Sequence, residues 1–363
     1  MWSASFRLAK GAFGGVQTRG YALMQSSAPL GKATYKPRHL MSISDLTRDE
    51  FSQLIRNASR RKQQVKDGRL APDFRGQLSN QTVAMMFSKR STRTRVSTES
   101  AVAMMGGHPM FLGKDDIQLG VNESLHDTSK IISSMTSCMV ARVGPHSDVT
   151  ELAKYSSVPV INALSDDFHP LQTIADFLTI HETVTFPDRH RDAVIPPGLK
   201  IAWIGDANNV LFDLAIACVK MGVTISVATP PGYEIPKAME ALIEAQAKGV
   251  ESPGKLEQTT VPEQAVKDAD ILVTDTWISM GQEAETKKRL KDFEGFQITK
   301  ELARRGGAKP DWLFMHCLPR HPEEVDDEVF YGTRSVVFQE GENRLWAAIA
   351  ALEAFVVNKG NIV

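Results

Sequence analysis

The chain of 363 residues has only three cysteines and almost no net charge, and each shortage excludes a class of protein. Cys138, Cys218 and Cys317 lie far apart, so they form neither a disulfide scaffold nor a zinc site with paired ligand spacing. A net charge of −1 provides no overall basic field for nucleic acid or an anionic membrane. Long hydrophobic runs are also missing, because charge or glycine interrupts the most apolar stretches within about ten residues. We therefore expect a soluble protein, long enough for two domains, with no nucleic-acid or membrane partner.

Acidic residues are absent from residues 1–44, where arginine and lysine are spread among Ala, Ser, Gly and aromatic residues. An acid-free, arginine-bearing start without an uninterrupted apolar core is typical of a mitochondrial transit peptide rather than a secretory signal. A merely disordered tail is the alternative. The stretch "RGYA" (19–22) resembles the Arg-x-Tyr cleavage context of matrix precursors, which places the start of the mature chain near Ala22. We therefore predict a transit peptide and flexible N-terminus over residues 1–39 and a location in the mitochondrial matrix.

Beyond this segment, short apolar runs alternate with helical patterns. The first group of runs is "TVAMMF" (82–87), "PMFLG" (109–113), "CMVARV" (138–143) and "VPVINA" (158–163). After a proline-containing stretch over 185–200, the runs resume with "KIAWIG" (200–205), "TISVAT" (224–229), "ADILVTD" (269–275) and "WLFMHCL" (312–318). Alternation of this kind predicts parallel sheets with helices on both faces.

The expected fold class is therefore α/β, with two doubly wound, Rossmann-like parallel-sheet domains joined by a linker. We place the first domain over 40–183 and the second over 199–340. An amphipathic C-terminal helix over 341–363 is expected to pack back toward the first domain.

The stretch "SKRSTRTR" (88–95) packs four cations into eight residues, where the run 82–87 ends and a helical pattern begins. Free backbone N–H groups and the dipole at a helix N-terminus favour an anion, and arginine side chains fork onto phosphate oxygens. We therefore predict a phosphate-binding turn formed by Ser91, Thr92, Arg93 and Thr94. In the alternative interpretation, Ser91 is only a helix cap and the arginines form a solvated face.

The segment "STRTR" (91–95) resembles the carbamoyl-phosphate signature Ser-x-Arg-Thr of the aspartate and ornithine transcarbamylases. Three further segments follow in the family's order, namely "ARVG" around Arg142, "HPLQ" (169–172) and "HCLPR" (316–320). They extend the resemblance across nearly the whole chain beyond the N-terminal segment. The resemblance implies transfer of a carbamoyl group from carbamoyl phosphate to an amine. No metal or organic cofactor is expected, because phosphate is already a good leaving group and the site needs only cations and donors.

On the carbamoyl-phosphate side, the resemblance implies that Arg93 is the main phosphate ligand. It also implies that Arg142 and His169 donate to the carbamoyl oxygen and that Gln172 holds the carbamoyl nitrogen. Judged alone, Arg142 could be a surface charge and His169 a helix-entry residue ahead of a proline. The full implied set is Ser91, Thr92, Arg93, Thr94, Gln118, Arg142, His169, Gln172, Cys317, Leu318 and Arg344.

On the amine side, two features of the resemblance separate ornithine from aspartate. Cys317 matches a cysteine beside the attacking amine in ornithine transcarbamylases, whereas the aspartate enzymes usually carry proline there; as a lone residue it could be a buried thiol. The segment "DTWISMG" (275–281) resembles the loop that closes over ornithine, which implies contacts from Asp275, Ser279 and Met280. Asn209 matches the residue that holds the ornithine α-carboxylate.

The resemblance thus implies conversion of L-ornithine to L-citrulline, with Arg142, His169, Asp275 and Cys317 as the catalytic residues. It also implies a homotrimer in which the loop 111–124 reaches the neighbouring site, with Gln118 as the cross-subunit ligand. Transfer to aspartate, putrescine or acetylornithine stays open, as does a non-catalytic regulatory partner that binds carbamoyl phosphate. A nicotinamide enzyme is a fold-level alternative, but "GDANNV" (205–210) lacks the G-x-G-x-x-G glycines.

Overall fold

The computed structural model describes residues 36–117, 123–184, 193–278 and 283–363. Gln118, Ser279 and Met280 lie outside these ranges, as do most of the predicted transit peptide and part of the predicted linker. None of the helices within the described ranges combines the length and the apolarity needed to cross a bilayer.

The first sheet is parallel throughout and has the strand order β2-β1-β3-β4. Its strands are β1 (Thr82–Phe87), β2 (His108–Gly113), β3 (Cys138–Arg142) and β4 (Val160–Leu164). The central strands β1 and β3 read as nearly continuous apolar runs because both of their faces are covered.

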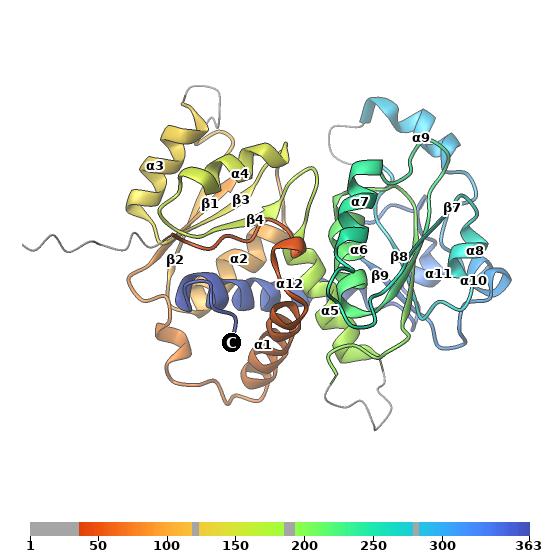
Figure 1. Ribbon diagram of the computed structural model, residues 1–363, viewed down its shortest axis with the longest axis horizontal. Helices are drawn as coiled ribbons and strands as arrows, with labels where there is room; N and C mark the ends of the chain where they lie inside the picture. The colour runs from red at the N-terminus through yellow and green to blue at the C-terminus, as the bar shows by residue number, and fades with distance from the viewer. Residues whose placement is uncertain (1–35, 118–122, 185–192, 279–282) are drawn as a thin grey trace, which may run out of the picture. The chain divides into compact units, whose positions relative to one another are not determined.

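Helices cover both faces of this first sheet (Figure 1). Along β1, Val83 and Met85 belong to one apolar cluster, whereas Ala84 and Met86 belong to another, because successive side chains of a strand point to opposite faces. The first cluster includes side chains of α1 (Arg48–Lys66), α2 (Arg93–Met104), α5 (Pro170–Thr183) and α12 (Val337–Leu352). The second includes side chains of α3 (Leu125–Met135) and α4 (His146–Tyr155).

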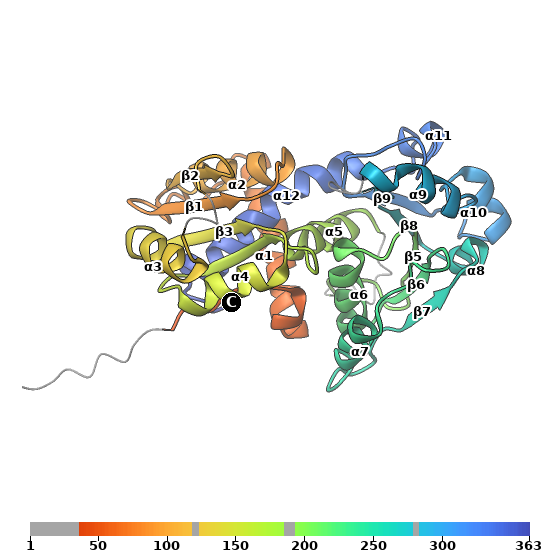
Figure 2. The same ribbon diagram turned by 90° about the horizontal axis from the view of Figure 1, so that it is seen from above.

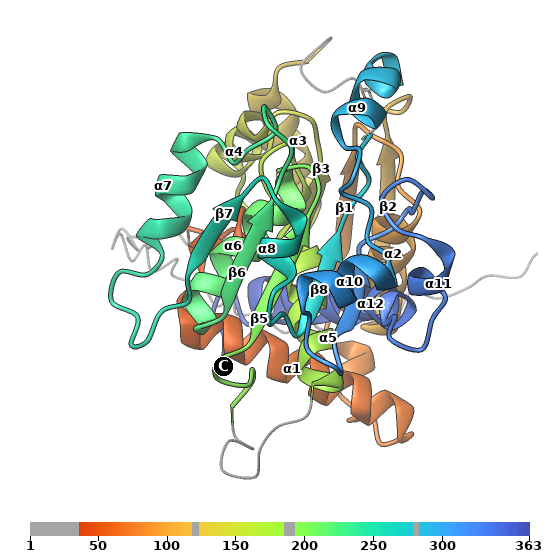
Figure 3. The same ribbon diagram turned by 90° about the vertical axis from the view of Figure 1, so that its right-hand side faces the viewer.

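The second sheet is also parallel, with the strand order β7-β6-β5-β8-β9. Its strands are β5 (Lys200–Ile204), β6 (Thr224–Ala228), β7 (Leu256–Thr259), β8 (Ile271–Thr274) and β9 (Leu313–His316). Ile201 and Trp203 face a cluster that contains α6 (Asn209–Met221) and α7 (Lys237–Ala245). Ala202 and Ile204 face a cluster that contains α8 (Pro262–Val266), α10 (Lys300–Gly306) and α11 (Asp327–Phe330) (Figure 3).

Two parallel sheets, each with helices on both faces, confirm the predicted α/β class with two doubly wound domains. The strands lie within residues 82–164 and 200–316. The exact domain limits stay a prediction. The remaining short elements are η1 (Ile43–Asp45), η2 (Phe74–Gly76), η4 (Glu283–Glu285), α9 (Thr286–Asp292) and the π-helical turn η5 (Glu353–Val357).

Helix α12 begins at Val337 and contacts α1, α2 and α5, so the end of the chain packs on helices of the first sheet. Figure 2 shows α12 beside α5. Of its polar residues, Glu340, Asn343 and Arg344 are buried. A buried carboxyl group, amide or guanidinium is costly unless it has a hydrogen-bond partner. The partners of Glu340 and Arg344 lie at the site described next.

Helix α1 and strand β7 are not named among the elements predicted from the sequence. Helix α1 starts with a capping box, in which Thr47 accepts from the backbone of Glu50 and the Glu50 side chain accepts from the backbone of Thr47. Its buried Phe51, Leu54, Ile55 and Ala58 follow helical spacing, so both signals are present in the sequence. Strand β7 is a half-exposed edge strand with the sequence LEQT, and it carries no apolar run to reveal it.

Candidate active site

The carboxyl ends of strands from both sheets border one cavity of about 1080 Å³. Open parallel sheets bind ligands at this edge. The cavity brings together these predicted residues: Ser91, Thr92, Arg93, Thr94, Arg142, His169, Gln172, Asn209, Asp275, Cys317, Leu318 and Arg344. Gln118, Ser279 and Met280 are the predicted site residues that lie outside the described ranges.

The turn after β1 leads into α2, which begins at Arg93. Ser91 Oγ accepts from the backbone N–H of Thr94 at 3.2 Å, although the N-cap residue itself is Thr92, whose side chain makes no capping bond. The two arginines of the segment "STRTR" (91–95) differ. Arg95 pairs with Glu99 at 2.9 Å and stacks on Phe111 away from the residues that line the cavity. Arg93 lines the cavity and donates to the backbone carbonyl of Leu318, so it is the arginine available to an anion.

Arg93, Arg142 and Arg344 gather on one side of the cavity. Burial, reinforced by the charges of the neighbouring arginines, lowers the pKa of Arg142 and of Arg344 to about 10. Both guanidiniums therefore stay charged at neutral pH. The buried Nε atoms of Arg142 and Arg344 have no hydrogen-bond partner among the described residues. Such a group of cations is expensive to hold unless an anion meets it, which favours a phosphate-bearing ligand.

His169 precedes Pro170 at the start of α5 and is 4% exposed. Burial lowers the pKa of His169 well below its usual value, and the charges of Arg344 and Arg142 lower it further. The imidazole is therefore neutral at pH 7. Its Nδ1 has no partner within the described part of the chain, whereas its backbone N–H donates to Asp213 Oδ2 at 2.8 Å. A neutral imidazole beside three arginines is suited to donate a hydrogen bond to a ligand oxygen without adding charge.

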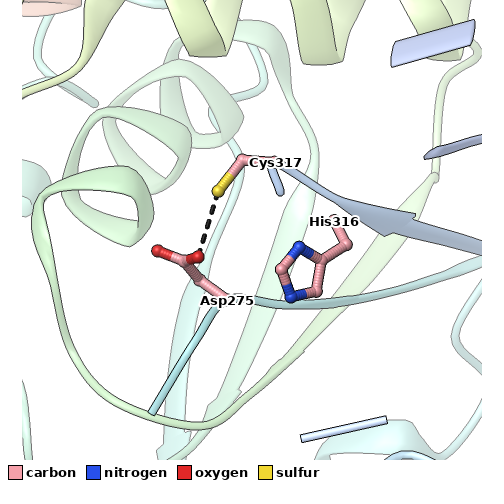
Figure 4. A group of neighbouring side chains, drawn as sticks. All are labelled: Asp275, His316 and Cys317. Atoms are coloured by element: carbon pink, nitrogen blue, oxygen red, sulfur yellow. Dashed lines mark hydrogen bonds between the residues drawn. The ribbon is translucent and has the colours of Figure 1, made fainter. Parts of the chain in front are cut away.

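In the same cavity, the Cys317 thiol donates to Asp275 Oδ1 at 3.1 Å (Figure 4). Burial raises the pKa of Cys317 well above its usual value, and the neighbouring Asp275 carboxylate raises it further. One ligand atom from each of Asp275, His316 and Cys317 lies within 4.8 Å of the others. His316 Nδ1 accepts from the backbone N–H of Leu318 at 2.8 Å, so this nitrogen and the Cys317 thiol already have hydrogen-bond partners.

The turn after β9 presents the Leu318 carbonyl to Arg93. Leu318 has a φ of 61°, and its bond to Pro319 is cis. A branched residue with positive φ is uncommon and often marks a functional turn. The contact ties this turn to the start of helix α2.

Asn208 and Asn209 open helix α6, and the sequence interpretation singled out only the second. Asn208 Oδ1 caps the helix by accepting from Val210 N at 3.0 Å and Leu211 N at 3.2 Å. Its Nδ2 donates to Asp275 Oδ2 at 2.8 Å, which orients that carboxylate. Asn209 Nδ2 donates to the carbonyl of Ser165 at 2.5 Å. An asparagine directly before a helical pattern is a readable cap signal, but its second bond is not visible in the sequence.

Two buried carboxyl groups near the site are also not predicted from the sequence. Asp176 lies one helical turn after Gln172 on α5, and Glu340 lies one turn before Arg344 on α12. Gln172 donates to both carboxyl groups, which stand behind the cavity rather than in its lining. The spacing of four residues in each helix is the signal that could have found them.

The fold and the site define a two-domain parallel α/β protein with an arginine-lined cavity between the strand ends. The family model for the aspartate/ornithine carbamoyltransferase carbamoyl-phosphate-binding domain matches residues 38–182, and that for the Asp/Orn-binding domain matches residues 197–355. The chain belongs to the aspartate/ornithine carbamoyltransferase family, as the sequence resemblance predicts.

Individual relatives show which branch of the family the chain resembles. A mitochondrial ornithine carbamoyltransferase of Aspergillus terreus is 66% identical over 337 residues, which cover 93% of each chain. One from Coccidioides immitis is 69% identical over 330 residues, covering 90% of this chain and 95% of the relative. The crystal structure of a mitochondrial ornithine carbamoyltransferase from Coccidioides immitis matches with a TM-score of 0.84 and 67% identity, covering 90% of this chain and all of that one (100%). The ornithine carbamoyltransferase from Pyrococcus furiosus matches with a TM-score of 0.80 and 43% identity over 90% and 98% of the chains.

Proposed function

We propose that this protein transfers the carbamoyl group of carbamoyl phosphate to the side-chain amine of L-ornithine, which yields L-citrulline and phosphate. The observation that carries the proposal is one cavity in which Arg93, Arg142 and Arg344 face the Cys317–Asp275 pair. Relatives at 66–69% identity named mitochondrial ornithine carbamoyltransferase support the same reaction and a mitochondrial location. An aspartate acceptor is not favoured, because its second carboxylate requires a further cation beside Asp275.

On the carbamoyl-phosphate side, the phosphate lies at the N-terminus of α2 and on Arg93, with the hydroxyls of Ser91, Thr92 and Thr94 close by. Arg142, neutral His169 and Arg344 donate to the carbamoyl oxygen as it gains negative charge. Gln172 and the backbone of Cys317 and Leu318 receive the carbamoyl nitrogen. Bound carbamoyl phosphate thus supplies acceptor oxygens to Arg142 and Arg344, whose Nε atoms have no hydrogen-bond partner among the described residues.

On the ornithine side, Asn209 holds the α-carboxylate, and Asp275 with Ser279 and Met280 orients the side chain. The attacking amine must be neutral, although an amine of this kind is mostly protonated near pH 7. Asp275 is the better proton acceptor of the two candidates, because the raised pKa keeps Cys317 in its thiol form. The new N–C bond forms as the C–O bond to phosphate breaks, and phosphate leaves with the electron pair of that bond.

The test is citrulline formation by the purified protein supplied with carbamoyl phosphate and, in parallel, ornithine, aspartate, putrescine or acetylornithine. We expect product with ornithine alone. Arg93→Ala is expected to lower kcat/KM at least about 100-fold, because a charge-assisted contact to phosphate is lost. Product with a different amine would contradict the assigned acceptor, and no product with any amine would favour a non-catalytic carbamoyl-phosphate-binding protein.

A further inference from the structure

Gln172 can adopt only one amide orientation in its surroundings. Its Nε2 donates to Asp176 Oδ1 at 2.7 Å and to Glu340 Oε1 at 3.0 Å. Its Oε1 accepts from Arg344 Nη1 at 2.6 Å. A guanidinium only donates, and the carboxyl oxygens that face the amide accept, so turning the amide over would set donors against donors. The oxygen of Gln172 is therefore the only group that it can offer to a ligand.

The two carboxyl groups behind Gln172 form a pair between α5 and α12. Asp176 is 3% exposed and Glu340 is 2% exposed. Burial raises the pKa of both groups, that of Asp176 to about 7, and the neighbouring Asp176 carboxyl raises the pKa of Glu340 further. Asp176 Oδ1 and Glu340 Oε1 both accept from Gln172. On Glu340 both oxygens are in use, because Oε2 accepts from the backbone N–H of His316 at 2.9 Å.

We propose that Asp176 and Glu340 are positioning residues that fix the Gln172 oxygen toward the transferred group, so that the site selects an acyl phosphate bearing an N–H. A carbamoyl group offers N–H donors at this place, whereas an acetyl group of the same size offers a methyl group. Arg344 occupies only one of the two lone pairs of the Gln172 oxygen, and a methyl group would leave the second without a donor, so the site would disfavour it. The inference rests on the proposed function for the identity of the transferred group.

The hydrogen-bond pattern makes an asymmetric prediction for two similar substitutions. In Glu340→Gln, one amide cannot accept from both Gln172 and His316, so a donor must face a donor at one of the two places. In Asp176→Asn, the new amide can accept from Gln172 and donate to Glu340, so the orientation of Gln172 survives. A role that depends only on negative charge would make the two variants equal.

The experiment compares two stable phosphonates by calorimetry, without ornithine. Phosphonoacetamide carries the carbamoyl NH₂, and acetonylphosphonate carries a methyl group in its place. We expect the wild type to prefer phosphonoacetamide and Glu340→Gln to lose about 10- to 100-fold of that preference, with inorganic phosphate bound as before. Asp176→Asn keeps the preference within about twofold. Glu353→Gln, which removes a buried carboxyl group paired with Arg61, is the matched control and leaves all three affinities unchanged.

Equal affinity of the wild type for the two phosphonates would overturn the inference. An equal loss of the preference for phosphonoacetamide in Glu340→Gln and Asp176→Asn would overturn it as well. A parallel loss for all three ligands in Glu340→Gln would show a merely structural role and also overturn it. If Glu340→Gln does not fold, Gln172→Leu tests the same point, because it removes the acceptor and should abolish the preference while retaining phosphate. These affinities do not depend on turnover, so an absence of citrulline would count against the proposed function alone.

Discussion

The Cys317 thiol faces a carboxylate, and this contact controls its reactivity. The thiolate is the reactive form of cysteine, and burial together with Asp275 raises the pKa that governs its formation. We predict that iodoacetamide modifies Cys317 slowly at about pH 7.5 and faster as the pH rises. Asp275→Asn should speed the modification, because the raising charge is removed. Peptide mass spectrometry after timed labelling measures both rates.

Two further cysteines provide an internal control for this labelling. Cys138 and Cys218 are both 0% exposed, and burial raises the pKa of each. Neither should be labelled while the protein is folded. A Cys317 that reacts at neutral pH as fast as a free thiol, or a slower reaction in Asp275→Asn, would contradict the assigned protonation state.

Asp213 joins the chain before α1 to the start of α5. Its Oδ1 accepts from Ser42 Oγ at 2.8 Å and Ile43 N at 2.9 Å, and its Oδ2 accepts from His169 N at 2.8 Å. Burial raises the pKa of Asp213 from 3.8 to about 7. A raised pKa means that the folded state holds a proton that the unfolded chain has released. The stability contributed by this proton is therefore complete below the unfolded pKa and is lost as the pH rises toward 7.

We predict that Asp213 alone contributes a fall in the free energy of unfolding of up to about 1.4 kcal/mol per pH unit between about pH 4 and pH 7. Asp213→Asn removes this contribution, so the free energy of unfolding of the variant falls less, or rises more, with pH than that of the wild type. It also lowers stability by about 1–3 kcal/mol, because the amide sets a donor against Ser42 and Ile43 or against His169. Urea unfolding at a series of pH values measures both effects, with exposed Asp311→Asn as the control. An unchanged slope in Asp213→Asn would refute the assignment.

At the scale of elements, the start of α6 performs two tasks through one side chain. Asn208 caps the helix with its oxygen and orients Asp275 with its nitrogen. Asn208→Asp keeps the cap oxygen but places a second negative charge beside Asp275. We predict that this variant retains stability within about 0.5 kcal/mol but raises the KM for ornithine or lowers kcat by about tenfold.

The comparison variant Asn208→Ala loses both tasks. It should lower the free energy of unfolding by about 1 kcal/mol as well as the activity. Thermal unfolding and steady-state kinetics on the same preparations separate the two effects. If Asn208→Asp lost stability and kept full activity, the nitrogen would have no role in orienting Asp275.

The sequence predicts best the elements that have a local pattern of their own, such as an apolar run. Strands β1, β3, β5 and β8 are apolar runs, and the motif residues follow strand ends, so the fold and the motif residues of the cavity lining were predictable. Edge strand β7 lacks such a run. The cap Asn208 and the carboxyl groups of Asp176, Asp213 and Glu340 act through contacts far apart in the chain, for example Gln172 with Glu340 across 168 positions. Such contacts depend on how α5, α6 and α12 pack, which no local pattern records.

At the scale of the whole molecule, apolar side chains remain exposed on the first domain. Val96 on α2 is 58% exposed, and Ile131 and Met135 on α3 are 53% and 69% exposed. Apolar side chains exposed singly are common on monomeric proteins, so these exposures alone do not assign an interface. The trimer that the family resemblance implies, in which Gln118 of one subunit completes the site of its neighbour, therefore stays a prediction.

Mixed oligomers test this arrangement directly. Arg93→Ala disables the site in its own chain, whereas Gln118→Ala disables the site of the neighbouring chain. The two variants are mixed in equal amounts and assembled into trimers. Where a Gln118→Ala chain forms the main part of a site and its neighbour is an Arg93→Ala chain, the first supplies Arg93 and the second supplies Gln118, so the site has both side chains. Random assembly produces this combination in about a quarter of the sites. We therefore predict citrulline formation at about a quarter of the wild-type rate after co-refolding, although each variant alone is nearly inactive.

A second mixture separates sharing of sites from mere association. Arg93→Ala and Arg142→Ala both disable the chain that carries them, so every site in their mixed trimers lacks one arginine and no activity should return. Light scattering on each sample establishes that three chains are present. Recovery in both mixtures would point to exchange or contamination, and recovery in neither would place Gln118 outside the neighbour's site. Recovery in the first mixture alone requires that one subunit contribute a side chain to the next, because no single chain in that sample has both groups.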